Sequence, residues 1–244
     1  MINMDRKRLI FKTRQVWFSD TLFDIDGYSN IVFSHCRNKH IRKNFDCVKI
    51  VTSTINLEQD ILLIWENLKK KSCRYAIKRA IRDGIKIKIN EDYEEFYDIY
   101  KQFIKSKKTF LGIPENLYTI RKYGTLFVAE YNGELIGGHV YLEDGDTILY
   151  WISATKRFEN DTDKRTIIGN AAHLLHWEAI NYAKQMGIKE FDMGGLFVKT
   201  LNDEANSIDS FKESFGGVRT IKYNYSRNYD KIYNLIRMAY RYIM

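Results

Sequence analysis

Two turn dipeptides, Asn132-Gly133 and Asp144-Gly145, constrain the fold of this chain more than any other feature of its sequence. They separate three apolar segments at residues 126–131, 134–143 and 147–154. Asn, Asp and Gly tolerate the positive φ angles that tight β-hairpins require. The sequence therefore predicts three consecutive antiparallel strands, a β-meander, in the middle of the chain.

Helices and shorter strands flank this meander. Apolar residues recur at spacings of three and four over residues 57–83, which predicts one long amphipathic helix with Gly84 as its C-terminal stop. Other segments predict helices at residues 93–104, from Pro114 to near Gly124, at 167–186 with Gly187 as stop, at 207–215 and at 229–243, and strands at 85–89, 189–193 and 218–225. Residues 85–225 therefore follow the order β-α-α-β-β-β-α-β-α-β.

The charge of the chain favours anionic partners. The chain has 39 Lys and Arg residues and 31 Asp and Glu residues, which gives a formal net charge of +8 at pH 7. Residues 69–88 hold nine basic residues and only one acidic residue, Asp83. This balance suits a phosphate group, a nucleic acid or a membrane surface.

Several classes of protein are excluded by what the sequence lacks. Three cysteines are too few for a disulfide framework, and neither they nor the five histidines have metal-binding spacing. There is no Gly-x-Ser-x-Gly elbow and no P-loop. No apolar run predicts a spanning helix or a secretory signal. We expect a cytoplasmic protein that uses no metal.

Four stretches resemble the GNAT acyltransferase fold, in particular its FemAB-type branch of peptidoglycan aminoacyl transferases and their acetyltransferase-like relatives. They are WENLK and RYAIKRA within residues 65–84, LHWEAI at 175–180, GIKEFDMGG at 187–195 and SFKESFGG at 210–217. The stretches occur in the order of that family, and the order of predicted elements is similar to the GNAT order.

The resemblance implies an α/β (α+β) fold with a mixed, mostly antiparallel sheet flanked by helices. Its two central parallel strands, expected at residues 147–154 and 189–193, splay apart and leave a wedge for the donor thioester. We expect a complete domain of this type over residues 85–244. FemAB transferases usually hold two such domains, so residues 1–84 are expected to form a truncated first one that includes the long basic helix.

The resemblance also implies acyl-CoA as the donor, with acetyl-CoA as the simplest case. Ser153, on the first splayed strand, is the expected donor-side contact. The N-terminus of the following helix offers unpaired N–H groups and a positive dipole to a pyrophosphate. The segment KRTIIGNA at residues 164–171 is a degenerate form of the family's phosphate motif and assigns Arg165, Gly169 and Asn170 to the donor. The alternative is an ordinary helix start with a glycine packed against the sheet.

Lys212 and Asp192 are the candidate catalytic residues. In GNAT enzymes a tyrosine four residues before a glycine protonates the leaving thiolate, and this register places Lys212 before Gly216. An ammonium group in a partly dry cleft stabilises an oxyanion or protonates the leaving atom. Asp192 is expected either to accept a proton from the attacking amine or to cap the turn at Gly194-Gly195. The alternative for Lys212 is a solvated surface lysine.

Arg74, Tyr150 and Trp151 are the candidate acceptor-binding residues. Arg74 lies in the basic segment, and its guanidinium offers two parallel hydrogen bonds to a phosphate, although a solvated helix face is the alternative. Tyr150 and Trp151 alternate along a strand, so one is expected to face the wedge and the other the core. Residues 229–244 are a candidate for peripheral contact with the inner face of an anionic membrane, or for a helix that covers the sheet.

These features lead to three hypotheses. The first is an N-acyltransferase that moves an acyl group, acetyl being expected, directly from acyl-CoA to the amine of a phosphate-bearing acceptor, such as a nucleotide-linked amino sugar used for cell-envelope polysaccharide. The second keeps the fold but takes an aminoacyl-tRNA as donor and a peptidoglycan precursor as acceptor. The third is a non-enzymatic, basic nucleic-acid-binding domain, which leaves the SFKESFGG stretch unexplained.

Overall fold

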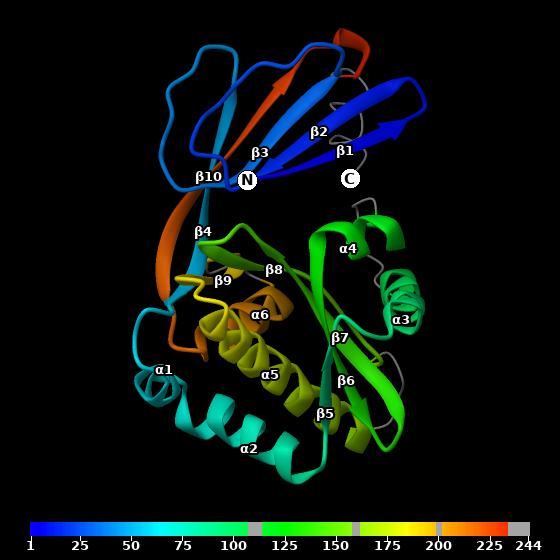
Figure 1. The fold of residues 1–244 in the computed structure, drawn as a ribbon, viewed down its shortest axis with the longest axis vertical. Helices are drawn as coiled ribbons and strands as arrows, with labels where there is room; N and C mark the ends of the chain where they lie inside the picture. The colour runs from blue at the N-terminus through cyan, green and yellow to red at the C-terminus, as the bar shows by residue number, and fades with distance from the viewer. Residues whose placement is uncertain (107–113, 158–161, 199–201, 234–244) are drawn as a thin grey trace. The chain divides into compact units, whose positions relative to one another are not determined.

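The computed structural model describes residues 1–106, 114–157, 162–198 and 202–233, which form two compact units (Figure 1). Unit 1 contains residues 1–52 and the C-terminal segment from Arg219, and unit 2 contains residues 53–218. The chain passes from unit 1 to unit 2 along β4 (Asp46–Asn56) and returns along β10 (Val218–Asn228). This division differs from the predicted boundary at residue 84, because residues 53–84 belong to unit 2.

Unit 1 is a sheet with the strand order β1-β2-β3-β10-β4. Its first strands are β1 (Ile2–Arg8), β2 (Phe11–Trp17) and β3 (Asn30–Cys36). β1 and β2 are antiparallel, β2 and β3 are parallel, and β3 and β10 are antiparallel. The core of the unit is a buried cluster of six residues, namely Val16, Leu22, Ile31, Phe33, Cys36 and Tyr225. The sequence analysis predicted none of the strands β1 to β4.

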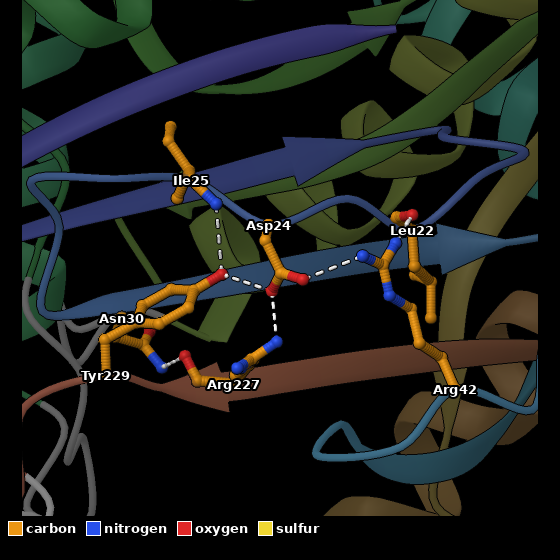
Figure 2. A network of polar contacts seen from close by, with 7 residues as sticks. All are labelled: Leu22, Asp24, Ile25, Asn30, Arg42, Arg227 and Tyr229. Atoms are coloured by element: carbon orange, nitrogen blue, oxygen red, sulfur yellow. Dashed lines mark hydrogen bonds and ion pairs between the residues drawn. The ribbon is translucent and has the colours of Figure 1, made fainter.

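A polar network around Asp24 ties a connecting segment of unit 1 to the end of β10 (Figure 2). Asp24 forms ion pairs with Arg42, at 2.7 Å, and with Arg227. The Tyr229 hydroxyl donates to Asp24 at 3.0 Å and accepts from the Ile25 N–H at 3.2 Å. Because exposed ion pairs contribute little to stability, we expect this network to fix the path of the connection more than to stabilise the unit.

Unit 2 contains the predicted meander. Its strand order is β9-β8-β7-β6-β5. The strands are β5 (Lys86–Ile89), β6 (Gly124–Tyr131), β7 (Glu134–Glu143), β8 (Thr147–Thr155) and β9 (Glu190–Leu196). β5 to β8 pair antiparallel, and β8 and β9 pair in parallel. The turn between β6 and β7 has φ angles of 52° at Asn132 and 79° at Gly133, as the dipeptide predicted.

Helices cover both faces of the unit 2 sheet. They are α1 (Ile61–Asn67), the π-helical turn η1 (Lys70–Arg74), α2 (Tyr75–Arg82), α3 (Tyr93–Ser106), α4 (Leu117–Tyr123), α5 (Thr162–Gln185) and α6 (Asp203–Glu213). Residues of α1, α2 and α5 share one core cluster with one face of the sheet, and α3 and α4 share another with the opposite face (Figure 1). No helix within the described ranges combines the length and apolarity needed to cross a bilayer.

Two glycines end helices as predicted. Gly84 and Gly187 follow α2 and α5 with φ angles of 78° and 74°. The Gly84 N–H bonds to the Ile81 carbonyl, and the Ile85 N–H bonds to the Ala80 carbonyl, both at 3.1 Å. These are the two bonds of the Schellman motif, in which glycine avoids the strain of a left-handed conformation.

Three predicted helices differ from those in the structure. The predicted helix over residues 57–83 breaks at Leu68, which is extended (φ −63°, ψ 137°). The N–H of the next residue, Lys69, bonds to the Ser214 carbonyl at 2.8 Å, a contact that periodicity does not reveal. α5 begins at Thr162 rather than at residue 167, and α6 spans Asp203–Glu213 rather than residues 207–215. Most of the predicted helix over residues 229–243 lies outside the described residues.

Two glycines after α6 let the chain approach the end of α1 and the strand β4 closely. A Cβ atom at Gly216, where φ is 74°, would lie 2.4 Å from the Asn67 carbonyl oxygen. A Cβ atom at Gly217 would lie 2.6 Å from the Ser53 hydroxyl oxygen. The end of the SFKESFGG stretch therefore packs closely on the last residue of α1 and on β4.

Gly216→Ala is expected to lower the free energy of unfolding by about 2–4 kcal/mol, because it adds both left-handed strain and a backbone clash. Gly195→Ala is the matched control, since a Cβ atom there meets nothing within 4 Å, and should change stability by about 0.5 kcal/mol or less. Urea unfolding of both variants measures the difference. Equal midpoints for the two variants would contradict this account of the close approach.

Candidate active site

The two parallel strands in unit 2 separate after a short paired stretch. β8 and β9 are in register at three positions, Thr147↔Glu190, Ile148↔Phe191 and Leu149↔Asp192. β8 continues to Thr155 and β9 to Leu196, both fully described, but their ladder ends at Leu149 and Asp192. This confirms the predicted splay. We call the diverging edges of β8 and β9 beyond these two residues the fork.

A turn at Asp192 and Gly194 bends β9 where the fork opens. The Asp192 Oδ1 atom accepts a hydrogen bond from the Gly194 N–H at 2.8 Å, a side-chain turn typical of Asp. Gly194 has a φ of 76°, and a Cβ atom there would lie 3.2 Å from the Tyr150 carbonyl oxygen. The structure thus bears out the capping interpretation of Asp192. Its role toward a substrate stays a prediction.

Lys212 reaches the fork from α6. Its Nζ atom donates to the Gly195 carbonyl of β9 at 2.7 Å and lies 5.9 Å from the centre of the Tyr150 ring of β8. The residue is 9% exposed, so it is not a solvated surface lysine. Burial lowers the pKa of Lys212, against the opposing effect of the Asp192 and Asp209 carboxylates. A buried, acidified ammonium group therefore stands where the strands separate.

Asp209 fixes the end of β9 to the same helix. It is buried and lies three residues before Lys212, so both side chains share one face of α6. Its two carboxylate oxygens accept hydrogen bonds from the N–H groups of Phe197 and Val198, both at 2.9 Å. Hydrogen bonds of Asp209 and Lys212 thus fix residues 195–198 to α6. They keep this part of the chain on the β9 side of the fork.

Tyr150 and Trp151 lie on opposite faces of the sheet. Tyr150 is opposite Tyr141 of β7 whereas Ile152 is opposite Val140, so Trp151 is the additional residue of a β-bulge. Tyr150 packs on the α5 side and Trp151 on the α3 and α4 side. Trp151 therefore does not share the face on which Lys212 approaches the fork.

Ser153 is on the same side as Tyr150. The side chains of these two residues are hydrogen-bonded, which partly opposes the effect of burial that raises the pKa of Tyr150 to about 12. The Tyr150 phenol is thus protonated at neutral pH. Four of the predicted site residues, Lys212, Asp192, Tyr150 and Ser153, meet at the fork.

A buried histidine pair lies behind Tyr150, and the sequence analysis did not anticipate it. The Tyr141 hydroxyl lies 2.8 Å from His176 Nδ1 and 3.4 Å from His139 Nδ1. The His176 ring packs 4.5 Å from the Tyr150 ring, centre to centre. Burial lowers the pKa of His139 to about 3 and that of His176 well below its usual value. Both imidazoles are therefore neutral at pH 7 and give the fork a dry, aromatic wall.

One face of α5 leads from this wall toward the N-terminus of the helix. Gly169, His173 and His176 follow each other at spacings of four and three, so they share a face. His173 packs against Phe211 and Phe215 at 4.7 and 5.7 Å between ring centres. A Cβ atom at Gly169 would lie 3.6 Å from the guanidinium of Arg157, which follows β8. Arg157 is a cation at the α5 end of the fork that the sequence analysis missed.

The predicted phosphate turn is not a turn. Arg165, Gly169 and Asn170 all lie within α5, which begins at Thr162. Gly169 and Asn170 lie beyond the first turn, where N–H groups bond within the helix and do not face a ligand. The expectation that their backbone amides are unpaired was wrong, because the helix starts earlier than its apolar pattern indicates. Contact of their side chains with the donor stays a prediction.

Arg74 lies at the end of η1, not on the strands of the fork. Its Nε atom is buried and has no hydrogen-bond partner within the described part of the chain. η1 is joined to α6 by the bond from Lys69 to Ser214, two residues after Lys212. π-Helical turns often occur at functional sites. The role of Arg74 in acceptor binding stays a prediction.

A splayed pair of parallel strands with a buried ammonium group at the opening forms the candidate active site of unit 2. The model of the acetyltransferase (GNAT) domain family matches residues 68–206. The chain belongs to this family of acyltransferases. The expectation of an acyltransferase enzyme is confirmed, and the hypothesis of a non-enzymatic nucleic-acid-binding domain is set aside.

Solved structures with low sequence identity share this fold. FemX has a TM-score of 0.63 at 11% identity, with 96% of this chain and 86% of that chain covered. L-PGS from Bacillus licheniformis has a TM-score of 0.57 at 13% identity, with 98% and 84% covered. The C-terminal domain (DUF2156) of a putative lysylphosphatidylglycerol synthetase from Agrobacterium fabrum has a TM-score of 0.56 at 11% identity, with 97% and 83% covered. No curated protein sequence matches the chain.

Lys212→Met should remove the ammonium group while it keeps the apolar stem, and lower acyl transfer by about 10²–10³-fold. Folding should persist with a lower Tm at pH 7, because the Gly195 carbonyl loses its hydrogen-bond donor. The depressed pKa means that the folded state holds this proton less tightly than the unfolded state, so the wild type gains stability as pH rises toward 10.5 and the deficit of the variant should grow. Kinetics and thermal unfolding at two pH values measure both effects. Lys105→Met, on the exposed surface of α3, is the control, and equal activity of the two variants would contradict the role of Lys212.

Asp192→Asn should preserve the turn, because the amide oxygen still accepts the Gly194 N–H. Asp192→Ala should lose it and lower the unfolding free energy by about 1–3 kcal/mol. Loss of the carboxylate removes a group that raises the pKa of Lys212, so the alkaline limb of the pH–rate profile should move to lower pH in Asp192→Asn. A large, pH-independent loss of rate in that variant would instead identify Asp192 as the base.

Proposed function

We propose that the chain transfers an acyl group, acetyl being the simplest case, from acyl-CoA to the amine of a phosphate-bearing acceptor. The amine attacks the thioester carbon directly, without a covalent enzyme intermediate. A nucleotide-linked amino sugar for cell-envelope polysaccharide is the acceptor that we favour. The enzyme would act in the cytoplasm, with peripheral contact at the inner face of the membrane.

The observation that carries this proposal is the position of Lys212 in the fork. Beyond Leu149 and Asp192 the facing edges of β8 and β9 are released from mutual pairing, so their backbone groups are able to bind an extended donor arm. Lys212 Nζ lies at the same opening, bonded to the Gly195 carbonyl. A donor arm laid along the fork would bring its thioester to this ammonium group.

Lys212 suits the departure of a thiol. As the C–N bond forms and the C–S bond breaks, the sulfur becomes a thiolate, and the Lys212 ammonium gives it a proton. A thiol has a pKa of about 8.5. Burial lowers the pKa of Lys212 toward that range, which makes this proton transfer less unfavourable.

The donor's phosphates have candidate partners at the start of α5. The positive end of the helix dipole lies there, together with the exposed side chains of Arg157 and Arg165. Gly169 leaves the helix surface bare beside the Arg157 guanidinium. These groups support binding of a nucleotide diphosphate at the solvent end of the fork.

The cysteines support direct transfer. Burial raises the pKa of both Cys36 and Cys73 to about 12. A thiol with such a pKa is a poor nucleophile at neutral pH, because the thiolate is the reactive form. The remaining cysteine, Cys47, belongs to unit 1, whereas the fork is part of unit 2.

The basic turn η1 supports a phosphate-bearing acceptor. Lys69, Lys70 and Lys71 are exposed and precede Arg74. The bond from Lys69 to Ser214 tethers this turn beside the end of α6 that carries Lys212. An acceptor phosphate bound at η1 would thus be held near the helix that delivers the acid.

The second candidate uses an aminoacyl-tRNA as donor and a peptidoglycan precursor as acceptor. The likeness to FemX, which spans 96% of this chain, and the resemblance to FemAB transferases favour it. The same fork and Lys212 would serve this reaction, with an ester oxygen as the leaving atom.

Thermal-shift titration with acetyl-CoA, acetyl-pantetheine and a mixed tRNA distinguishes the donors. Acetyl-CoA at 100 times its Kd should raise Tm by about 5–10 °C, and acetyl-pantetheine, which lacks the nucleotide, should raise it less. Arg157→Gln should reduce only the acetyl-CoA shift, whereas Lys105→Gln should not. No shift with either thioester, together with tRNA binding that weakens steeply with salt, would contradict the acyl-CoA proposal and favour the second candidate.

A further inference from the structure

We propose that His173 is the proton acceptor of this site: its Nε2 atom takes the proton that the attacking amine loses. The inference rests on the proposed direct attack of an amine, whichever donor carries the acyl group. An amine that attacks a carbonyl carbon becomes positively charged and must release a proton before the product is neutral. Lys212 serves the leaving atom, and the Asp192 carboxylate caps the Gly194 N–H, so His173 takes the role that the sequence analysis offered to Asp192.

The hydrogen bond of His173 fixes its tautomer. Its Nδ1 atom lies 2.9 Å from the carbonyl oxygen of Gly169, one turn earlier in α5. A carbonyl oxygen only accepts hydrogen bonds, so Nδ1 must carry the proton. In the neutral ring Nε2 then holds a lone pair, and the backbone carbonyl orients the imidazole as a base.

The ring of His173 lies beside the helix that carries the proposed acid. It packs edge-to-face on Phe211, whose ring centre is 4.7 Å away and which directly precedes Lys212. It also stacks on Phe215 at 5.7 Å. One aromatic contact thus joins the helix of the proposed base, α5, to the helix of the proposed acid, α6. His173 would act on the attacking amine and Lys212 on the leaving sulfur.

His173 differs from the other two histidines near the fork in its access to water. His139 and His176 are 2% and 0% exposed, and each lies within hydrogen-bond reach of the Tyr141 hydroxyl. His173 is only partly buried. A proton that it accepts is able to pass on to solvent, whereas a proton on the other two rings would be trapped in an apolar core.

The groups that face His173 keep it neutral and therefore basic at pH 7. Burial lowers its pKa, the Gly169 carbonyl acts in the opposite direction, and the Arg157 guanidinium lowers it further. The other titratable groups packed around the site come from β7, β8, β9, α5 and α6, and are His139, Tyr141, Tyr150, Asp192, His176, Asp209 and Lys212. The two other histidines are neutral, and both carboxylates bind backbone amides of β9 and the segment after it.

The step balances without a further reactant. The amine nitrogen forms a bond to the acyl carbon, and the nitrogen's proton moves to His173 Nε2. The C–S bond breaks, and Lys212 Nζ gives a proton to the sulfur. The imidazolium then releases its proton to water and Lys212 regains one, so the net reaction moves one proton from nitrogen to sulfur.

Two measurements test the inference. Long-range ¹⁵N–¹H correlation spectra of the full chain, assigned with His173→Gln, should show His173 at pH 7 as the neutral tautomer with the proton on Nδ1. In acyl transfer, His173→Gln should lower kcat by about 10²-fold or more, as expected for loss of a general base, while the KM of the donor changes little. The acidic limb of the wild-type pH–rate profile should lie below pH 6.5 and disappear in the variant.

The controls separate this inference from the proposed function. His40→Gln, in unit 1, should leave rate and profile unchanged. A His173 ring that is cationic at pH 7, or protonated on Nε2, overturns the inference whether or not a donor is known. Wild-type activity with an unchanged rate and acidic limb in His173→Gln also overturns it, and leaves the acyl-transfer proposal intact.

Discussion

The early end of the pairing between β8 and β9 is the constraint on which the rest of the site depends. Two parallel strands with apolar neighbours would ordinarily continue their ladder, since unpaired backbone groups are unfavourable in a core. Here the Asp192 carboxylate accepts a hydrogen bond from the Gly194 N–H. From α6, Lys212 donates to the Gly195 carbonyl and Asp209 accepts from the Phe197 N–H, both of which lie beyond the last pair between β8 and β9. Side chains of α6 thus bind part of the backbone that no longer pairs with β8.

The same arrangement underlies the proposed chemistry. The ammonium group that satisfies Gly195 is buried against Tyr150 and lies near neutral imidazoles. Its environment weakens its hold on a proton, while Asp192 and Asp209 limit that effect. A group that is needed to hold β9 is thereby also suited to protonate a leaving sulfur, so structure and proposed catalysis share one side chain.

Local chemistry made part of this molecule predictable. The meander followed from Asn132-Gly133 and Asp144-Gly145, and the ends of α2 and α5 from Gly84 and Gly187, because each depends on residues adjacent in the chain. Lys212 and the splayed strands came from a family resemblance. The break at Leu68 depends instead on the bond between Lys69 and Ser214, which are far apart in sequence. β1 has the sequence INMDRKR, whose polar content hides a strand. In α5, polar and apolar residues are mixed around the helix, so no periodicity singles out the face that carries His173.

An experimental structure of the full chain with a non-reactive thioether analogue of acetyl-CoA tests the central claim most directly. The account predicts that the sulfur of the analogue lies within about 3.5 Å of Lys212 Nζ, between β8 and β9, with the nucleotide near the start of α5. An analogue bound elsewhere, or a ladder that continues past Leu149 and Asp192 and closes the fork, would contradict it.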